Sequence, residues 1–511
     1  MKWIKKFWNF IIKSLGYLLL SVILVGLLTW FVWRPIKLAS YSPVKADRLP
    51  QKQAYLESIR PQSTQSPNII LINFDDLGYG DLSCYGNQLI RTPVMDSLAA
   101  HGIRMTDFYS CSPVCTPSRA GLLTGRHPER SYAGDHVYFP EDHVVSSFRK
   151  LLSLKNEIPQ DEIMLSEILK SAGYRTAIIG KWHLGDRSGH LPNDFGFDTY
   201  FGVRYSNDML PLHLYRNQEI LEEDHTELVS GSKSYTDPDM PLKRQGTDQT
   251  QLTIRYTEEA IQFIQHNQEQ PFFLYLPHSF PHVPHFSSPR QAGQSEAGLY
   301  GDVIEDLDWS VGQIMAELHR MQLDSNTLVF ITSDNGGDLQ GSVGHFRGRK
   351  QLTFEGGQRV PMIIYAPSLI PAPVTTKEMA SNLDILPTVL DLLDLKLPED
   401  RIIDGKSLLP LIQGQQAGPH SFLFYTSAQT GEFKGVRNRR FKYLEDAPGN
   451  AIPLLGPLGI ISSMKPQLSE LTRDNESHNL IKKYADEAEE LKEVLEESRK
   501  AIEQNRRGWR E

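Results

Sequence analysis

The stretch NIILINFDDLGYG, residues 68–80, sets an apolar run directly before two adjacent aspartates. Residues 69–72 are Ile-Ile-Leu-Ile, without the alternation of apolar and polar residues that a half-buried strand shows. Such a run is typical of a strand covered on both faces, as in the parallel sheets of α/β proteins. Asp75 and Asp76 then stand where this strand is expected to end.

Three further stretches repeat this design, an apolar run followed by polar side chains. The runs cover residues 176–179, 272–276 and 328–332, and they precede Lys181 and His183, His278 and His282, and Asp334 and Asn335. Helical patterns over residues 164–171, 250–266 and 300–319 lie between them. This alternation predicts an α/β fold, a large mixed, mostly parallel sheet between helices, with ligands bound beyond the carboxyl ends of the strands.

Two of these strand ends carry only oxygen and amide groups. Asp75, Asp76, Asp334 and Asn335 suit a hard cation, Ca²⁺ with Mg²⁺ as the alternative, better than they suit zinc. Any one of these ends also fits an ordinary turn. Together they favour a metal site, whose positive charge would attract an anionic substrate.

The stretch CTPSRAGLLTG, which begins at Cys115, has the pattern of a short helix. Pro117 suits the first helical turn, Thr116 could cap it and Gly125 could end it. Cys115 would then lie just outside the helix N-terminus, where free N–H groups favour an anion. Arg119 can direct a guanidinium to the same place.

CTPSRAGLLTG also matches, without a departure, the C-x-P-x-R-x-x-x-x-T-G signature of type I sulfatases, in the alkaline phosphatase superfamily. In that family the motif cysteine is oxidised to formylglycine, whose aldehyde hydrate is the nucleophile. The resemblance therefore implies that Cys115 is modified, and that a formylglycine-generating maturation enzyme is a partner of this protein.

Further motifs extend the resemblance from residue 68 to about residue 480 and indicate the arylsulfatase-like branch. They are NFDDLGYGDLSCYG, GKWHLG, RYSNDM, PHVP, TSDNGG and GRKQLTFEGGQRVP. By this resemblance the metal ligands are Asp75, Asp76, Asp334 and Asn335, together with residue 115. The residues around the sulfate are Arg119, Lys181, His183, Ser206, His282 and Lys350.

The activity implied is hydrolysis of a sulfate monoester, on a sulfated glycan, a sulfated lipid or an aryl sulfate. Lys181, Ser206 and Lys350 would bind sulfate oxygens, and His282 would protonate the leaving oxygen. His183 would accept the proton that releases the sulfate. The alternatives are a phosphonate monoester or phosphodiester hydrolase on the same scaffold, and a membrane-tethered binding protein without catalysis.

The N-terminus has the composition of an uncleaved transmembrane signal anchor, expected over residues 1–34. Residues 14–33 carry no charge, and about 20 apolar residues suffice to cross a bilayer as a helix. A cleaved signal peptide usually has a shorter apolar run. Residues 35–66 are expected to be a linker, and the large domain that follows is expected to be exported, into the periplasm, a lumen or the cell exterior.

The remaining chain is expected to form a sulfatase catalytic domain over residues 67–418 and a C-terminal subdomain over residues 419–511. The latter would contain a small antiparallel sheet and a terminal helix over residues 481–504. A net charge of −9 argues against nucleic-acid binding. The other two cysteines, Cys84 and Cys111, are interpreted as small buried apolar residues, with a bridge between them left open.

Overall fold

The structure is a computed structural model. Apart from isolated residues between 13 and 24, it describes residues 48–134, 136–141, 146, 156–209, 211–223, 247–371, 373–415, 418–447 and 465–511. Most of the predicted membrane anchor, residues 1–34, lies outside this part of the chain. Among the described residues, no helix combines the length and apolar character needed to cross a bilayer.

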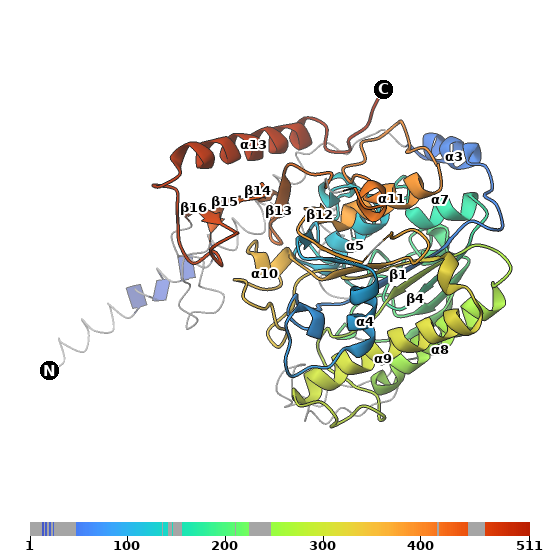
Figure 1. The fold of residues 1–511 in the computed structure, drawn as a ribbon. Helices are drawn as coiled ribbons and strands as arrows, with labels where there is room; N and C mark the ends of the chain where they lie inside the picture. Colours follow the sequence, from blue (N-terminus) through green and yellow to red (C-terminus); the bar gives the residue numbers. More distant parts are fainter. Residues whose placement is uncertain are drawn as a thin grey trace.

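A mixed sheet is the centre of the fold, as predicted (Figure 1). Within the described residues its strands are, in spatial order, β11 (Val374–Thr376), β2 (Ile103–Met105), β10 (Met362–Tyr365), β9 (Thr327–Ser333), β1 (Asn68–Phe74), β8 (Phe272–Pro277), β4 (Arg175–Ile179), β5 (Thr199–Gly202), β6 (Leu214–Arg216) and β7 (Glu219–Glu222). The central strands from β9 to β5 run parallel, and β10, β6 and β7 pair antiparallel with their neighbours.

The four apolar runs of the sequence form the four central strands because both faces of the sheet are covered. In β1, Ile69 and Leu71 belong to one apolar core, whereas Ile70 and Ile72 belong to another. Successive side chains of a strand point to opposite faces. A strand buried on both sides therefore needs apolar residues at every position, and all of β1 is buried.

Helices form a layer on each face of the sheet (Figure 1). The layer on the core of Ile69 contains α5 (Cys115–Thr124), α7 (Leu165–Ser171) and α11 (Ile385–Leu392). The layer on the core of Ile70 contains α4 (Pro93–His101), α8 (Leu252–His266) and α9 (Gly298–Arg320). The predicted helices correspond to α7, α8 and α9, with starts within two residues of those expected.

The predicted C-terminal arrangement of strands beside a last helix is present (Figure 1). An antiparallel sheet contains β13 (Leu423–Thr426), β14 (Phe433–Arg437), β15 (Phe441–Ala447) and β16 (Lys465–Glu470). Helix α13 (Ala485–Gln504) packs on it through Leu491 and Leu495. The helix starts later than residue 481, because residues 481–484 form a turn.

Shorter elements complete the described fold. They are α3 (Leu49–Ser58), α10 (Glu355–Gln358), α12 (Leu409–Ile412) and a small parallel pair, β3 (Phe108–Tyr109) with β12 (Ala380–Ser381). Helix α3 lies in the stretch expected to be an irregular linker. It packs on the domain through Lys52, whose ammonium lies 2.6 Å from a carboxylate oxygen of Glu167 in α7.

Candidate active site

The carboxyl ends of four neighbouring strands carry the polar residues that the sequence singled out. Strands β9, β1, β8 and β4 lie side by side in this order and run parallel. Their ends therefore meet at one edge of the sheet. Ten residues named as candidates come together there through short contacts: Asp75, Asp76, Cys115, Arg119, Lys181, Ser206, His282, Asp334, Asn335 and Lys350.

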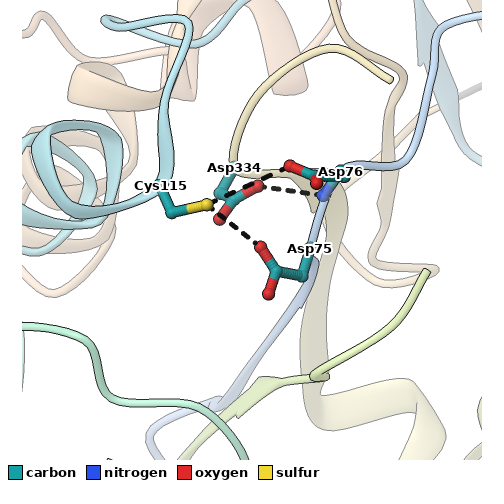
Figure 2. Close-up of side chains that lie close together, drawn as sticks. All are labelled: Asp75, Asp76, Cys115 and Asp334. Atoms are coloured by element: carbon teal, nitrogen blue, oxygen red, sulfur yellow. Dashed lines mark hydrogen bonds between the residues drawn. The ribbon is translucent and has the colours of Figure 1, made fainter. Parts of the chain in front are cut away.

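Three carboxylates and one thiol form the centre of this group (Figure 2). One ligand atom from each of Asp75, Asp76, Asp334 and Cys115 lies within 4.8 Å of the others, and all four residues are buried. Cys115 Sγ lies 3.3 Å from Asp75 Oδ1. Asn335 donates its amide hydrogen to Asp76 Oδ1 over 2.7 Å, and no donor within the described ranges reaches its own Oδ1.

The backbone after β1 is unusual at the second aspartate. Asp76 has a φ of 68°, a left-handed conformation that few residues other than glycine adopt. Its N–H donates to Asp334 Oδ1 over 3.2 Å, and the next N–H, of Leu77, donates to Ser333 Oγ over 2.9 Å. The turn after β1 is thus held against the end of β9, which keeps the two aspartates beside Asp334.

Helix α5 begins at Cys115, two residues earlier than expected from a cap at Thr116, so Cys115 lies inside the helix and not just outside it. Val114 precedes the helix, and Thr116 lies inside it and donates its hydroxyl hydrogen to the carbonyl oxygen of His183 over 3.1 Å. The prediction that Thr116 caps the helix was wrong, since a tertiary contact uses its hydroxyl. Gly125 ends the helix with a φ of 67°, as expected.

Arg119 connects this helix to the carboxylates. Its guanidinium is fully buried and donates to Asp334 Oδ2 through Nε over 2.9 Å and to the carbonyl oxygen of Lys181 through Nη1 over 2.9 Å. A third nitrogen, Nη2, lies 3.5 Å from Asp75 Oδ1. Arg119 therefore offsets the charge of both aspartates and holds them beside Cys115.

Lys181 follows β4 after Gly180, and only glycine fits at that turn. Gly180 has a φ of 129°, and a Cβ there would lie 1.9 Å from the carbonyl oxygen of Pro277 in β8. The close approach of the two strand ends brings Lys181 Nζ to 2.6 Å from Asp75 Oδ2 and 2.7 Å from Ser206 Oγ. Lysine and serine thus present two donors side by side.

His183 lies beside the helix and is neutral. Its Nε2 lies 3.0 Å from the carbonyl oxygen of Tyr138, so Nε2 carries the hydrogen. Burial, and then the charges of Lys181 and Arg119, hold the pKa of His183 well below its usual range. Its Nδ1 is therefore a bare acceptor, which no donor in the described part of the chain reaches.

His282 and Lys350 contact the second aspartate of the group. Both face Asp76 Oδ2, at 3.7 Å from His282 Nε2 and at 2.7 Å from Lys350 Nζ. His282 Nδ1 lies 3.1 Å from Asn207 Oδ1 and 2.6 Å from the carbonyl oxygen of Val283. Two acceptors at Nδ1 fix the hydrogen there and leave Nε2 facing the site.

The amino-acid sequence had not singled out Asn207. It directly follows Ser206 in the motif RYSNDM and is buried, and its amide hydrogens go to Gln249 Oε1 and to the carbonyl oxygen of Pro284, each over 3.0 Å. Its neighbour in the motif was the only sequence feature that could have indicated it.

The comparison with known proteins agrees with this geometry. Residues 67–395 match the family model of the sulfatases. The chain belongs to the sulfatase family. The expectation of a type I sulfatase is thereby confirmed, and with it the hydrolase class of the enzyme.

Similar proteins support the same family. The sulfatase is 36% identical to human steryl-sulfatase over 442 residues, which cover 73% of this chain and 74% of that protein. It is 39% identical to canine N-acetylgalactosamine-6-sulfatase over 376 residues, or 71% of this chain and 69% of the relative. It also resembles a solved structure from work on the metabolism of multiple glycosaminoglycans by Bacteroides thetaiotaomicron. The two share a TM-score of 0.73 and 29% identity, over 85% of this chain and all of that chain.

The ionisable groups at the centre of the sulfatase site shift one another's pKa values. Burial alone would raise the pKa of Asp75, but the charges of Lys181, His282 and Arg119 hold it well below its usual range. Burial, followed by the nearby charge of Asp75, raises the pKa of Asp334 to about 7. Burial and the same carboxylates raise the pKa of the Cys115 thiol well above its usual range. An unmodified thiol in this sulfatase is thus a poor nucleophile at neutral pH.

Two further histidines, His278 and His285, and the other two cysteines form no hydrogen bond or ion pair with the site residues in the described part of the chain. His278 is buried and stacked on Phe74, with ring centroids 5.6 Å apart, and His285 lies against the ring of Tyr300. All three cysteines of the sulfatase are free thiols, so the bridge left open between Cys84 and Cys111 is absent. Cys111 is buried, as expected, but Cys84 is only partly buried.

Proposed function

We propose that this sulfatase hydrolyses sulfate monoesters with a formylglycine formed from Cys115 as its nucleophile and with a divalent cation, Ca²⁺ or Mg²⁺, as its cofactor. The observation that carries the proposal is the buried group of Asp75, Asp76, Asp334 and Cys115, whose ligand atoms lie within 4.8 Å of one another. Three basic residues surround this group: Arg119, Lys181 and Lys350.

The donor set fits a hard cation. Three carboxylates in a space this small repel one another unless cations offset their charge, and oxygen ligands are those that Ca²⁺ and Mg²⁺ prefer. The bare, buried Oδ1 of Asn335 adds a neutral oxygen. Asp75, Asp76, Asp334 and Asn335, with residue 115, would hold the ion, which would supply positive charge for the sulfate.

The nucleophile comes from residue 115, at the first turn of α5. As its hydrate, formylglycine would supply two hydroxyls on one carbon: one as the nucleophile toward sulfur, and a second whose deprotonation would allow the bound sulfate to be expelled. Asp334, whose carboxylate lies in the same buried group as residue 115, is our candidate to accept the proton of the attacking hydroxyl.

Binding of the sulfate oxygens falls to the donors beside Asp75. Lys181 Nζ and Ser206 Oγ lie 2.7 Å apart and are both buried, so one sulfate oxygen can contact both. Lys350 Nζ, beside Asp76, would contact a second oxygen. Contacts to two different sulfate oxygens would restrict rotation of the sulfate and so help to orient its leaving group.

Two histidines carry the protons. The hydrogen on His282 Nδ1 is held by Asn207 and Val283, so Nε2 faces the site. When the imidazole carries a second proton, on Nε2, it can transfer that proton to the leaving oxygen. His183 has its hydrogen on Nε2 and a bare Nδ1, which suits it to accept the proton of the second hydroxyl. The two histidines thus have opposite roles.

Two substrate classes follow from the relatives, a steryl sulfate and a 6-sulfated N-acetylgalactosamine. We infer that the chain acts on a sulfated lipid or a sulfated glycan, and turnover of these two compounds in parallel separates the classes.

We also propose that residues 1–34 anchor the protein in a membrane, with residues 67–418 as the exported catalytic domain and 419–511 as its C-terminal subdomain. Cell fractionation with external protease tests this location.

The central experiment is mass spectrometry of the peptide that contains Cys115, taken from protein made in its native host. We expect the mass of this peptide to be lower than calculated from the sequence by the amount that conversion of CH2–SH into CHO gives. We also expect folded Cys115→Ala to have lost sulfatase activity. A fully active enzyme with an intact thiol would disprove the proposal. Turnover of nitrophenyl phosphonate above that of nitrophenyl sulfate would favour the phosphonate hydrolase instead.

A further inference from the structure

The segment that brings Lys350 to the site does not belong to any strand of the central sheet. It runs from Arg347 to Glu355, the first residue of α10. Three hydrogen bonds tie it to the site: Lys350 Nζ to Asp76 Oδ2 over 2.7 Å, Lys350 N to the carbonyl oxygen of Gly337 over 3.0 Å, and Gln351 N to the carbonyl oxygen of Pro113 over 2.9 Å. We call this segment, residues 347–355, the Lys350 loop.

One residue of the C-terminal subdomain contacts both ends of the Lys350 loop. The carbonyl oxygen of Glu476 accepts a hydrogen bond from Arg347 Nη1 over 2.9 Å. The carboxylate oxygen Oε2 of Glu476 accepts the N–H of Glu355 over 2.8 Å. Glu476 is fully buried and has a φ of 65°, a backbone conformation that surrounding contacts must hold.

A lysine of the same subdomain connects these carboxylates. Lys442 Nζ, in β15, lies 2.9 Å from Glu476 Oε1 and 3.0 Å from Glu355 Oε1, and the side chains of all three residues are inaccessible to solvent. Glu355 also accepts the hydroxyl hydrogens of Tyr109 over 2.6 Å and of Tyr425 over 2.5 Å. Its position is therefore determined by hydrogen bonds from both parts of the molecule.

The surrounding charges are balanced, and an apolar contact adds to them. Three acidic residues, Asp107, Glu355 and Glu476, form ion pairs with three basic residues, Arg359, Arg437 and Lys442. Phe354, the last residue of the loop before α10, packs with Leu444 and Ala447 of β15. The loop is thus attached to β15 by charge and by apolar burial.

We infer that Glu476 and Lys442 are positioning residues, which hold the Lys350 loop so that the Lys350 ammonium remains at Asp76. The inference rests on the proposed role of Lys350 in binding sulfate. It gives the C-terminal subdomain a task in the reaction, although none of its residues is needed in contact with the sulfate. A displacement of about 1 Å at a group that orients a substrate can cost about 10²-fold in rate.

The test is a double-mutant cycle on the full-length chain, purified in a mild detergent, with kcat and KM measured on nitrophenyl sulfate. Glu476→Ala is expected to lower kcat/KM by about 10-fold to 100-fold. In the Lys350→Ala background the same substitution is expected to have no further effect, because the group that it positions is gone. Glu445→Ala, a change of the same kind in β15 that removes an ion pair with Arg499, is the matched control and should leave kcat/KM unchanged.

The outcomes distinguish a failure of this inference from a failure of the proposed role of Lys350. If the losses from Glu476→Ala and Lys350→Ala multiply, Glu476 does not act through Lys350 and the inference is wrong. If Lys350→Ala alone leaves kcat/KM unchanged, the proposed role of Lys350 fails and the inference falls with it. Should Glu476→Ala not fold, the isosteric Glu476→Gln gives the same cycle, since it retains an oxygen for the Glu355 N–H but loses the charge facing Lys442.

Discussion

Replacing Lys442 with methionine should destabilise the protein strongly, because it leaves two carboxylates buried without their shared cation. Nζ lies 3.0 Å from Glu355 and 2.9 Å from Glu476, and neither carboxylate has access to water. At an effective dielectric constant of about 20, one such pair is worth about 5 kcal/mol, most of which offsets the loss of hydration. Removal of one partner from a buried pair costs about 3–5 kcal/mol, which is the expected loss for Lys442→Met.

The cost should depend on pH, and the sign follows from Glu476. Burial raises the pKa of Glu476 from 4.5 to about 7. The positive charge of Lys442 lowers this pKa, and the negative charge of Glu355 raises it. Without Lys442 the ionised form of Glu476 is still less favourable in the folded protein. Above about pH 4.5 the unfolded chain releases the proton of this carboxyl group, whereas the folded variant retains it. Lys442→Met should therefore be destabilised more at about pH 8 than at about pH 5.

The assay is urea denaturation of the full-length chain in a mild detergent, followed by far-ultraviolet circular dichroism. Lys434→Met is the matched control: Lys434 lies in β14 of the same sheet, 21% of its side chain is exposed, and its amine is 3.3 Å from Glu445. Its loss should cost no more than about 1 kcal/mol. If both variants unfold within about 1 kcal/mol of the parent near pH 8, the reasoning about the buried charges is refuted.

Three further outcomes are expected. Asn207→Leu removes one of the two acceptors of His282 Nδ1 and should lower kcat by about 10-fold or more for substituted phenyl sulfates with poor leaving groups, with less effect for good ones. An equal loss across the series would contradict the role of Asn207. Chelation of divalent cations should abolish activity and lower the melting temperature, with both restored by added Ca²⁺ or Mg²⁺; full activity in protein shown by elemental analysis to be metal-free would disprove the cofactor. Glu129→Gln should stabilise the protein by up to about 3 kcal/mol near pH 8 and by little below about pH 5. Burial raises the pKa of Glu129 from 4.5 to about 7, so its ionisation destabilises the folded state only above the pKa of the unfolded chain. A difference in melting temperature that is the same at both pH values would contradict this.

The elements of the central sheet could be predicted because their apolar runs have a local physical cause. A strand covered on both faces needs apolar side chains at every position, and the unbroken run at residues 69–72 meets this requirement. Helix ends were less predictable. Thr116 has the residue type of a cap, but its hydroxyl is taken by the carbonyl of His183, a contact between residues 67 positions apart that no local pattern contains.

The amino-acid sequence by itself determined which chemical groups follow the central strands: carboxylates after β1 and β9, an amine and an imidazole after β4, and a cysteine at the start of α5. Residue type and strand end are local properties, so they can be predicted from short stretches of sequence.

Only the tertiary structure decided which of these groups meet. The order β9–β1–β8–β4 brings the strand ends together, Asn207 reaches His282, and Glu476 contacts both ends of the Lys350 loop. These contacts join residues 75 or more positions apart. They form because packing of the whole domain lowers the free energy enough to offset the entropy of closing such long loops, a balance to which no single stretch of the chain contributes alone.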